Sequence, residues 1–308
     1  MTEPEDQLPS TRARVVSAHR GAFRIMVDGD EAWAEMPGRR YHRAADRREH
    51  PVVGDWVRAT GWRRALDGGG SAIIEAIDPR SSLLVRKAAG DSTEPQPVVA
   101  NVALAAIVTS ANLDLAPRRI ERYLDMVAQP GVTQLIVLSN GDLDAAGEAA
   151  ALIGERFPRI ETVITSAHTG AGIAALRERI GDTTAVLLGS SGVGKSSLLN
   201  ALLGQVAQEV REIRTSDQRG QHTTTARRLL ALPERGFVID TPGMRELGLW
   251  SDDDEDGGDG DPLDALAQTC RFSDCTHQKE PGCALTAAVA SGQLSADQLN
   301  SYQLRRRE

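Results

Sequence analysis

Residues 189–196 read G-S-S-G-V-G-K-S, a complete phosphate-binding loop of the pattern G-x-x-x-x-G-K-[ST]. This loop constrains the fold strongly, because it works only between a buried strand and the start of a helix. Residues 183–188 are apolar enough for that strand, and residues 197–203 continue as a helix whose positive N-terminal end faces the anion. One of the chain's three lysines, Lys195, stands at the required position, so composition does not explain the match. The segment predicts a nucleotide-phosphate site in an α/β domain.

The residues of this loop have different roles. Glycines let successive backbone N–H groups point at phosphate oxygens, because a Cβ would block the backbone conformation and the close approach. Lys195 reaches the β- and γ-phosphates, and the Ser196 hydroxyl ligates Mg²⁺. We assign nucleotide binding to Gly189, Ser190, Ser191, Gly192, Val193, Gly194, Lys195, Ser196 and Ser197.

The composition indicates a folded chain with unevenly distributed charge. It has 308 residues, 41% of them hydrophobic, enough for packed cores in two or three domains. The net charge of −8 is concentrated in residues 250–264, which carry eight acidic side chains, whereas residues 10–64 hold twelve arginines and seven carboxylates. A polyanion would therefore meet a positive field near the N-terminus. No signal-peptide pattern or membrane-length apolar run is present, so we expect a cytoplasmic protein with no membrane partner.

Residues 11–77 alternate apolar and polar side chains in short bursts separated by Asp/Gly turns. The pattern predicts a small β-barrel, with the OB-fold as the commonest candidate, and it does not exclude an SH3-like barrel. We assign residues 1–85 to this OB-like barrel.

The pattern changes after a polar, proline-containing stretch at 90–97. Strand candidates at 102–108, 133–138 and 160–165 alternate with helix candidates at 117–128, 144–157 and 173–180, and strand candidates at 227–232 and 236–240 follow the phosphate loop. This alternation predicts a mostly parallel α/β sheet. We assign residues 86–250 to the α/β domain. Residues 251–308 form an acidic loop and a mainly helical C-terminal domain, with helices at 284–290 and 296–306.

Two loops after the phosphate loop carry groups that can sense a γ-phosphate. At 240–243 the chain reads D-T-P-G, where Asp240 can hold a Mg²⁺-bound water and the Gly243 N–H can contact the γ-phosphate. Residues 219–225 form a polar loop with three adjacent threonines, of which we assign Thr224 to Mg²⁺. An ordinary turn and a threonine-rich surface loop are the alternatives.

Two loops before the phosphate loop indicate the base. In the pattern N-K-x-D the aspartate accepts two hydrogen bonds from guanine, and the lysine stem covers the base. Asp142 is present here, but Ser139 and Asn140 replace the expected asparagine and lysine, which predicts weaker guanine binding. Ser166 and Ala167 match an S-A-x-x-G loop whose backbone contacts guanine O6. Together the two loops favour GTP over ATP.

The three cysteines and one histidine lie within 270–283, spaced C-x4-C-x-H-x5-C. Three thiolates and an imidazole in a closed set select Zn²⁺ in a structural role, because no coordination position remains for water. Free buried thiols are the alternative. The spacing predicts one structural zinc ion held by Cys270, Cys275, His277 and Cys283.

The order of these motifs is a circular permutation of the usual GTPase order, because the base loops precede the phosphate loop. With a barrel before it and a metal knot after it, the chain resembles the ribosome small-subunit-dependent GTPase A family over nearly its whole length. The resemblance implies a GTPase that uses GTP/GDP and Mg²⁺. It also implies a late assembly factor that binds the small ribosomal subunit and its 16S rRNA, is stimulated by that subunit and is released on GTP hydrolysis. We expect a monomer.

Hydrolysis needs a group that orients the attacking water. Many GTPases place a glutamine after the D-x-x-G turn, but Met244 stands there and cannot do so. His222 can reach the water when its loop closes, and the resemblance implies this role. A surface histidine is the alternative. We assign His222, Thr224 and Lys195 as catalytic residues.

Arginines lie beside aromatic rings in the barrel, where residues 38–43 read G-R-R-Y-H-R. This pattern suits RNA, because phosphate pairing and base stacking combine there, and a solvated arginine face is the alternative. Two other functions stay open: a nucleotide-regulated RNA-binding placeholder with negligible turnover, and an ATP-using P-loop enzyme.

Overall fold

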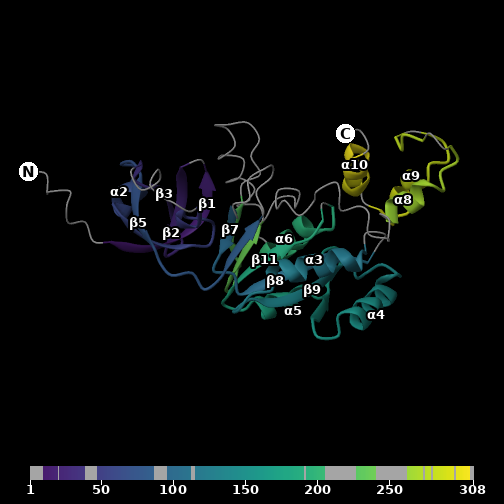
Figure 1. The fold of residues 1–308 in the computed structure, drawn as a ribbon, viewed down its shortest axis with the longest axis horizontal. Helices are drawn as coiled ribbons and strands as arrows, with labels where there is room; N and C mark the ends of the chain where they lie inside the picture. The colour runs from purple at the N-terminus through teal and green to yellow at the C-terminus, as the bar shows by residue number, and fades with distance from the viewer. Residues whose placement is uncertain are drawn as a thin grey trace, which may run out of the picture.

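A computed structural model of the protein describes residues 10–19, 21–38, 47–86, 96–111, 115–190, 192–204, 227–240, 262–272, 275–278, 280–294 and 296–305. Figure 1 shows three parts along the long axis of the molecule. A strand-rich part holds the N-terminal residues, an α/β sheet lies in the centre, and the last helices lie beyond it.

The N-terminal part is a closed five-stranded barrel, as the sequence pattern predicts. Its strands are β1 (Thr11–His19), β2 (Ala22–Val27), β3 (Asp30–Glu35), β4 (Trp56–Thr60) and β5 (Ala72–Ile77). They are arranged in the order β1-β2-β3-β5-β4, and β1 pairs with β4 to close the barrel. Alternate side chains point inward, so Val15, Ile25 and Ile74 are among the core residues. The short helix α2 (Trp62–Leu66) and the 3₁₀ turn η2 (Arg47–Glu49) lie between strands.

The central part is a mostly parallel sheet, again as predicted. Its strands are β8 (Leu104–Ser110), β9 (Thr133–Ser139), β10 (Glu161–Ile164), β11 (Thr184–Leu188), β12 (Arg228–Ala231) and β13 (Phe237–Asp240). The order is β10-β9-β8-β11-β13-β12, and β12 is antiparallel to its neighbour β13. Because β8, β9, β11 and β13 run in the same direction, their carboxyl ends meet at one edge, where ligands bind in such sheets.

Helices cover both faces of this sheet. One core contains Ile120 of α3 (Pro117–Val127) and Ile153 of α4 (Ala146–Arg156). The other contains Leu176 of α5 (Ile173–Ile180) and Leu199 of α6 (Lys195–Leu203). The strands between the two cores are buried on both faces, which explains their continuous apolar sequences.

The barrel and the central sheet are joined through paired strands. β1 pairs with β12, with Ser17 opposite Arg228, so that one eleven-stranded sheet runs through both parts. Arg228 donates to Glu31 of the barrel at 3.0 Å. Burial lowers the pKa of Arg14 to about 10, and this side chain donates to Thr184 of β11 at 3.0 Å. The barrel is therefore attached to the strand that leads into the phosphate loop.

A hairpin that the sequence pattern did not indicate lies at this junction. β6 (Leu83–Arg86) and β7 (Gln96–Ala100) pair antiparallel, on either side of the polar stretch. Pro97 made this segment look like a linker, but proline is tolerated in a two-stranded edge pair. The hairpin spans the proposed boundary between residues 85 and 86.

The C-terminal part has its own small core. It consists of α8 (Pro262–Ala267), which the sequence pattern did not indicate, with α9 (Ala284–Ala290) and α10 (Ala296–Arg305). Leu263, Leu285 and Tyr302 are buried together there. Among the residues that the structure describes, no helix is long and apolar enough to cross a membrane. The acidic segment 252–261 lies outside the described residues.

Candidate nucleotide site and metal cluster

The phosphate loop connects β11 to α6 at the carboxyl edge of the central sheet (Figure 1). A Cβ on Gly189 would lie 2.2 Å from the carbonyl oxygen of Val108, so only glycine fits beside β8. Gly194 has φ of 98° and is the N-cap of α6. The positive end of α6 therefore faces the loop, which is the arrangement that binds a phosphate.

Lys195 is held over the start of the loop. Its Nζ donates to the carbonyl oxygen of Gly189 at 2.6 Å and to that of Ser190 at 2.5 Å. Ser196 and Ser197 follow in the first turn of α6 and are exposed, so their hydroxyls are accessible. Ser191 lies outside the described residues.

Ser139 connects the base loop to the phosphate loop. The side chain is buried, and its Oγ lies 2.8 Å from the carbonyl oxygen of Val193 and 3.0 Å from that of Thr109. A hydroxyl has one proton, so it donates to one of these carbonyls at a time. Ser139 thus replaces asparagine with a shorter group that still reaches the phosphate loop.

Asn140 lies at the position where the pattern has lysine. Its backbone has φ of 54°, a conformation that asparagine tolerates better than most residues. Its side-chain amide donates to Ser110 Oγ at 2.8 Å, across the neighbouring strand end. An amide held there supplies no long apolar stem to cover a base.

The two base loops are in direct contact. A hydrogen bond from Ser166 keeps the pKa of Asp142 below its ordinary value, and the Gly141 N–H donates to the carbonyl of Thr165 at 2.9 Å. Ser166 is buried, whereas Asp142 and the neighbouring Ala167 are exposed. The carboxylate is therefore ionised and oriented, with its surroundings open to a ligand.

The third component is the end of β13. Asp240 is the last residue of this strand, and β13 is the parallel neighbour of β11. The carboxylate thus lies at the same sheet edge as the phosphate loop. Three other assigned residues, His222, Thr224 and Gly243, lie outside the described residues.

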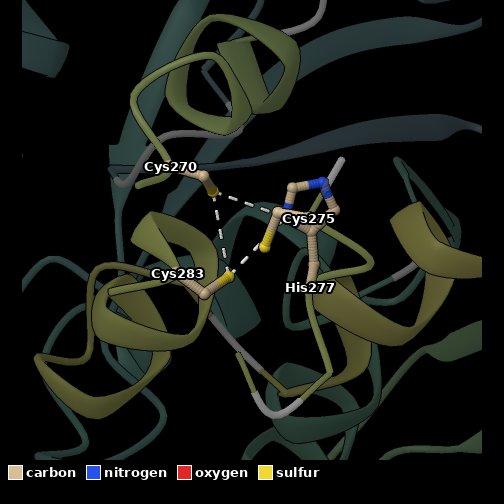
Figure 2. A group of neighbouring side chains, drawn as sticks. All are labelled: Cys270, Cys275, His277 and Cys283. Atoms are coloured by element: carbon tan, nitrogen blue, oxygen red, sulfur yellow. Dashed lines mark hydrogen bonds between the residues drawn. The ribbon is translucent and has the colours of Figure 1, made fainter. Parts of the chain in front are cut away.

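The predicted metal ligands converge in the C-terminal part, as Figure 2 shows. One ligand atom from each of Cys270, Cys275, His277 and Cys283 lies within 4.8 Å of all the others. Burial raises the pKa of Cys275 to about 11. Burial acts to raise the pKa of Cys283, but hydrogen bonds with Thr286, His277 and Cys275 together outweigh it and lower that pKa to about 6. The four ligand atoms are close enough together to hold one metal ion.

Helix α10 lies between this cluster and the phosphate loop. Gln303 donates to the backbone oxygen of His277 at 2.5 Å, and the rings of His277 and Tyr302 meet edge-on. At the start of the helix, a Cβ on Gly192 would lie 2.7 Å from Gln298 Cγ. The motifs gave no signal for this contact, because the helix is distant in sequence from the phosphate loop.

The sequence motifs also did not indicate a contact from α3. Arg119 donates to Ser190 Oγ at 2.5 Å. Its neighbour Arg118 is exposed. No sequence pattern separates these two arginines; only the helix position does.

These features define a class of protein: a circularly permuted P-loop GTPase fold between an OB-like barrel and a helical part with a metal cluster. Two solved structures share this fold. YjeQ from Thermotoga maritima has a TM-score of 0.58 at 26% identity, covering 96% of each chain. YloQ, described as a circularly permuted GTPase, has a TM-score of 0.54 at 22% identity, covering 100% of this chain and 99% of that one.

The chain belongs to the RsgA GTPase family. The model of that family matches residues 77–250. The small ribosomal subunit biogenesis GTPase RsgA of Opitutus terrae is 41% identical over 303 residues, which cover 96% of this chain and 83% of the relative. The protein of the same name from Xylella fastidiosa is 40% identical, covering 94% and 83%.

Proposed function

We propose that this protein hydrolyses GTP as a late assembly factor of the small ribosomal subunit. The observation that supports the proposal is the contact between two loops. Ser139 of the predicted base loop lies 2.8 Å from the carbonyl oxygen of Val193 in the phosphate loop, and Ser166 hydrogen-bonds Asp142. The names of the relatives supply the ribosomal context. Stimulation by the small subunit, binding of its 16S rRNA, action in the cytoplasm and a monomeric state are parts of the same proposal.

We assign the nucleotide-binding residues from their positions at the carboxyl edge of the sheet. Lys195 and the phosphate loop, residues 189–197, bind the phosphates, and Asp142 with the loop at Ser166 and Ala167 binds guanine. The exposed Ser196 and the end of β13 at Asp240 offer the hard oxygen donors that Mg²⁺ prefers, with Thr224 as a further ligand. When bound, Mg²⁺ would neutralise charge on the phosphate oxygens.

The residues that we assign to hydrolysis precede β12 or follow β13 in the sequence, outside the described residues. We assign His222 to orienting the attacking water, since Met244 cannot. Thr224 would ligate Mg²⁺, and the Gly243 N–H would contact the γ-phosphate. Their loops would therefore close only when GTP is bound.

The metal in the C-terminal cluster is zinc. In a tetrahedron with Zn–S bonds of about 2.3 Å, sulfurs lie about 3.8 Å apart. Cys270 and Cys283 Sγ are 3.9 Å apart, and His277 Nδ1 lies 3.5 and 3.6 Å from them. With four protein ligands no position remains for water, so the role is structural. Chelation should unfold the C-terminal helices, seen by far-UV circular dichroism, and abolish subunit binding while GTP still binds. An unchanged spectrum after complete zinc removal would contradict this.

The barrel is our candidate for rRNA contact. The arginine-rich segment 38–43, with Arg47 and Arg48, supplies positive charge at this end. The segment lies outside the described residues except for Gly38, so this assignment rests on the sequence. Replacing these arginines should weaken subunit binding and reduce its salt dependence.

The test is the hydrolysis of GTP and of ATP, each with and without purified small subunits. We expect GTP turnover that rises with subunits, loss of turnover in Lys195→Ala, and loss of the stimulated rate but not of GTP binding in His222→Ala. A protein that binds GTP and the small subunit but hydrolyses no GTP would instead be an RNA-binding placeholder. Preference for ATP would identify a different P-loop enzyme.

A further inference from the structure

A second cation contacts the phosphate loop. Arg119 lies in the first turn of α3, is half-buried, and its NH1 lies 2.5 Å from Ser190 Oγ. A guanidinium can only donate, so the serine hydroxyl accepts and its own proton points elsewhere. The bond joins α3, which packs against β8, to the start of the phosphate loop.

Ser190 is held by the lysine of the phosphate loop. In loops of this type the lysine reaches the β- and γ-phosphates. Here Lys195 Nζ lies 2.5 Å from the carbonyl oxygen of Ser190, so this residue is next to where those phosphates bind. Lys195 and Arg119 therefore hold the same residue, one through its carbonyl and the other through its hydroxyl.

The positive charges of Lys195 and Arg119, which both contact Ser190, repel each other. A bound polyanion offsets that repulsion. The energy gained increases with the charge on the nucleotide. GTP carries one phosphate more than GDP at this end, so the gain is larger for GTP. The contact thus favours the triphosphate, in addition to fixing the shape of the loop.

We propose that Arg119 is a positioning residue of the GTPase reaction, which fixes Ser190 at the opening of the phosphate loop and places a second positive charge beside the γ-phosphate. The proposal rests on GTP being the ligand of this loop. Arg119 does not touch the nucleotide in this account, and acts through Ser190 and its field.

The chain supplies a matched control next to it. Arg118 has the same side chain and the same helix, but it is exposed and points about 100° away around the helix axis. Replacing either arginine removes one charge from α3. Only the replacement of Arg119 removes the bond to Ser190.

The experiment measures the affinity of the full-length protein for GDP and for a non-hydrolysable GTP analogue, in Arg119→Ala, Arg119→Lys, Ser190→Ala, the double variant Arg119→Ala/Ser190→Ala, and Arg118→Ala. We expect Arg119→Ala to weaken the GTP analogue about tenfold and GDP at most about threefold, because charge-assisted bonds near the γ-phosphate are lost. Arg119→Lys should recover most of the loss. With Ser190→Ala already present, Arg119→Ala should cost less.

Steady-state turnover with small subunits gives the second readout. Because the charge acts on bound GTP and on the transition state alike, KM for GTP should rise about tenfold in Arg119→Ala while kcat changes less than about threefold. Arg118→Ala should match the wild type in both. The melting temperature of each nucleotide-free variant shows whether the fold is intact.

The proposal is overturned if Arg119→Ala and Arg118→Ala bind the GTP analogue equally. It is also overturned if Arg119→Ala weakens GDP as much as the GTP analogue in step with a lower melting temperature, since that is a purely structural effect. A wild-type protein that binds no GTP would overturn the proposed function itself. A wild type that binds GTP, with an indifferent Arg119→Ala, would overturn this inference alone.

Discussion

The two halves of the proposed nucleotide site are built in different ways. The phosphate half consists mainly of backbone groups and one lysine, and its sequence matches the phosphate-loop pattern at every position. A Cβ on Gly189 would lie 2.2 Å from Val108 O, so the glycine of the pattern is required there. The base half relies more on side chains, those of the loop at 139–142, and this loop departs from the usual pattern at Ser139 and Asn140. The difference follows from the chemistry, because backbone geometry admits few substitutes whereas a side-chain contact can be made by a different group.

Ser139 and Asn140 show the two outcomes of such a replacement. Ser139 is shorter than asparagine but still reaches the carbonyl of Val193 at 2.8 Å, so the connection to the phosphate loop is kept. Asn140 donates to Ser110 instead, so the apolar cover of the base is lost. We therefore expect a strong phosphate site and a weak guanine site in one sheet edge.

The largest effect should come from the phosphate half. Lys195→Ala removes the only side-chain cation that this loop itself contributes, and the affinity for both GDP and GTP should fall about a hundredfold or more. Calorimetry or a fluorescent nucleotide measures this directly. A loss below about threefold, with the variant folded, would show that the phosphate half is not dominant.

A smaller but base-specific loss is expected at Asp142. Asp142→Ala removes a charged acceptor of two guanine hydrogen bonds, so GDP affinity should fall about tenfold to a hundredfold, while the weak ADP affinity stays constant. The exposed Asp144, two residues on, is the control and its alanine variant should bind as the wild type does. Equal losses for GDP and ADP would place Asp142 outside the base site.

The base half should be improvable by a single change. Asn140→Lys restores the stem that covers a base, and burying roughly one methylene more should raise GDP affinity about fourfold. ADP serves as the comparison, because cover alone strengthens both nucleotides while Asp142 keeps guanine preferred. No gain for either nucleotide would mean that the Asn140 backbone at φ of 54° keeps the lysine away from the base.

The smallest effect concerns pH. The hydrogen bond from Ser166 holds the pKa of Asp142 below its ordinary value. When folding lowers the pKa of a carboxyl, its ionised form stabilises the folded protein. This stabilisation is complete above the unfolded pKa of about 3.9 and is lost as pH falls through the pKa of the folded state. The ratio of GDP affinity to ADP affinity should therefore be the same at about pH 5.5 as at about pH 7.5, because both nucleotides carry the same phosphates. In Ser166→Ala the pKa of Asp142 should rise, so the preference for GDP should be lost at a higher pH than in the wild type. An unchanged pH for this loss would argue against the Ser166 bond as the cause of the lowered pKa.

Much of the fold could be predicted because the spacing of apolar residues along the sequence indicates which segments are helices and which are strands. The predicted helix at 173–180 coincides with α5, and the predicted strand at 183–188 differs from β11 by one residue. The β6–β7 hairpin was missed because Pro97 and a polar stretch hide short edge strands from such patterns. Within the site, the Cys/His cluster could be predicted from spacing, since all four ligands lie close together in sequence.

The contacts that sequence could not give are those between distant segments. Arg119 and Ser190 are 71 residues apart, and nothing in the helix sequence separates Arg119 from Arg118. Gln298 meets Gly192 only because α10 packs over the phosphate loop. Such contacts depend on packing directions, which no local motif records.

The most direct test is the affinity of the wild-type protein for GDP and ADP, measured under the same conditions with Mg²⁺. We predict that GDP binds about tenfold to a hundredfold more tightly than ADP, because Asp142 reads guanine while the shared phosphate loop supplies most of the binding energy. Equal affinity for the two nucleotides would contradict the account, because Asp142 and Ser166 would then form no guanine site.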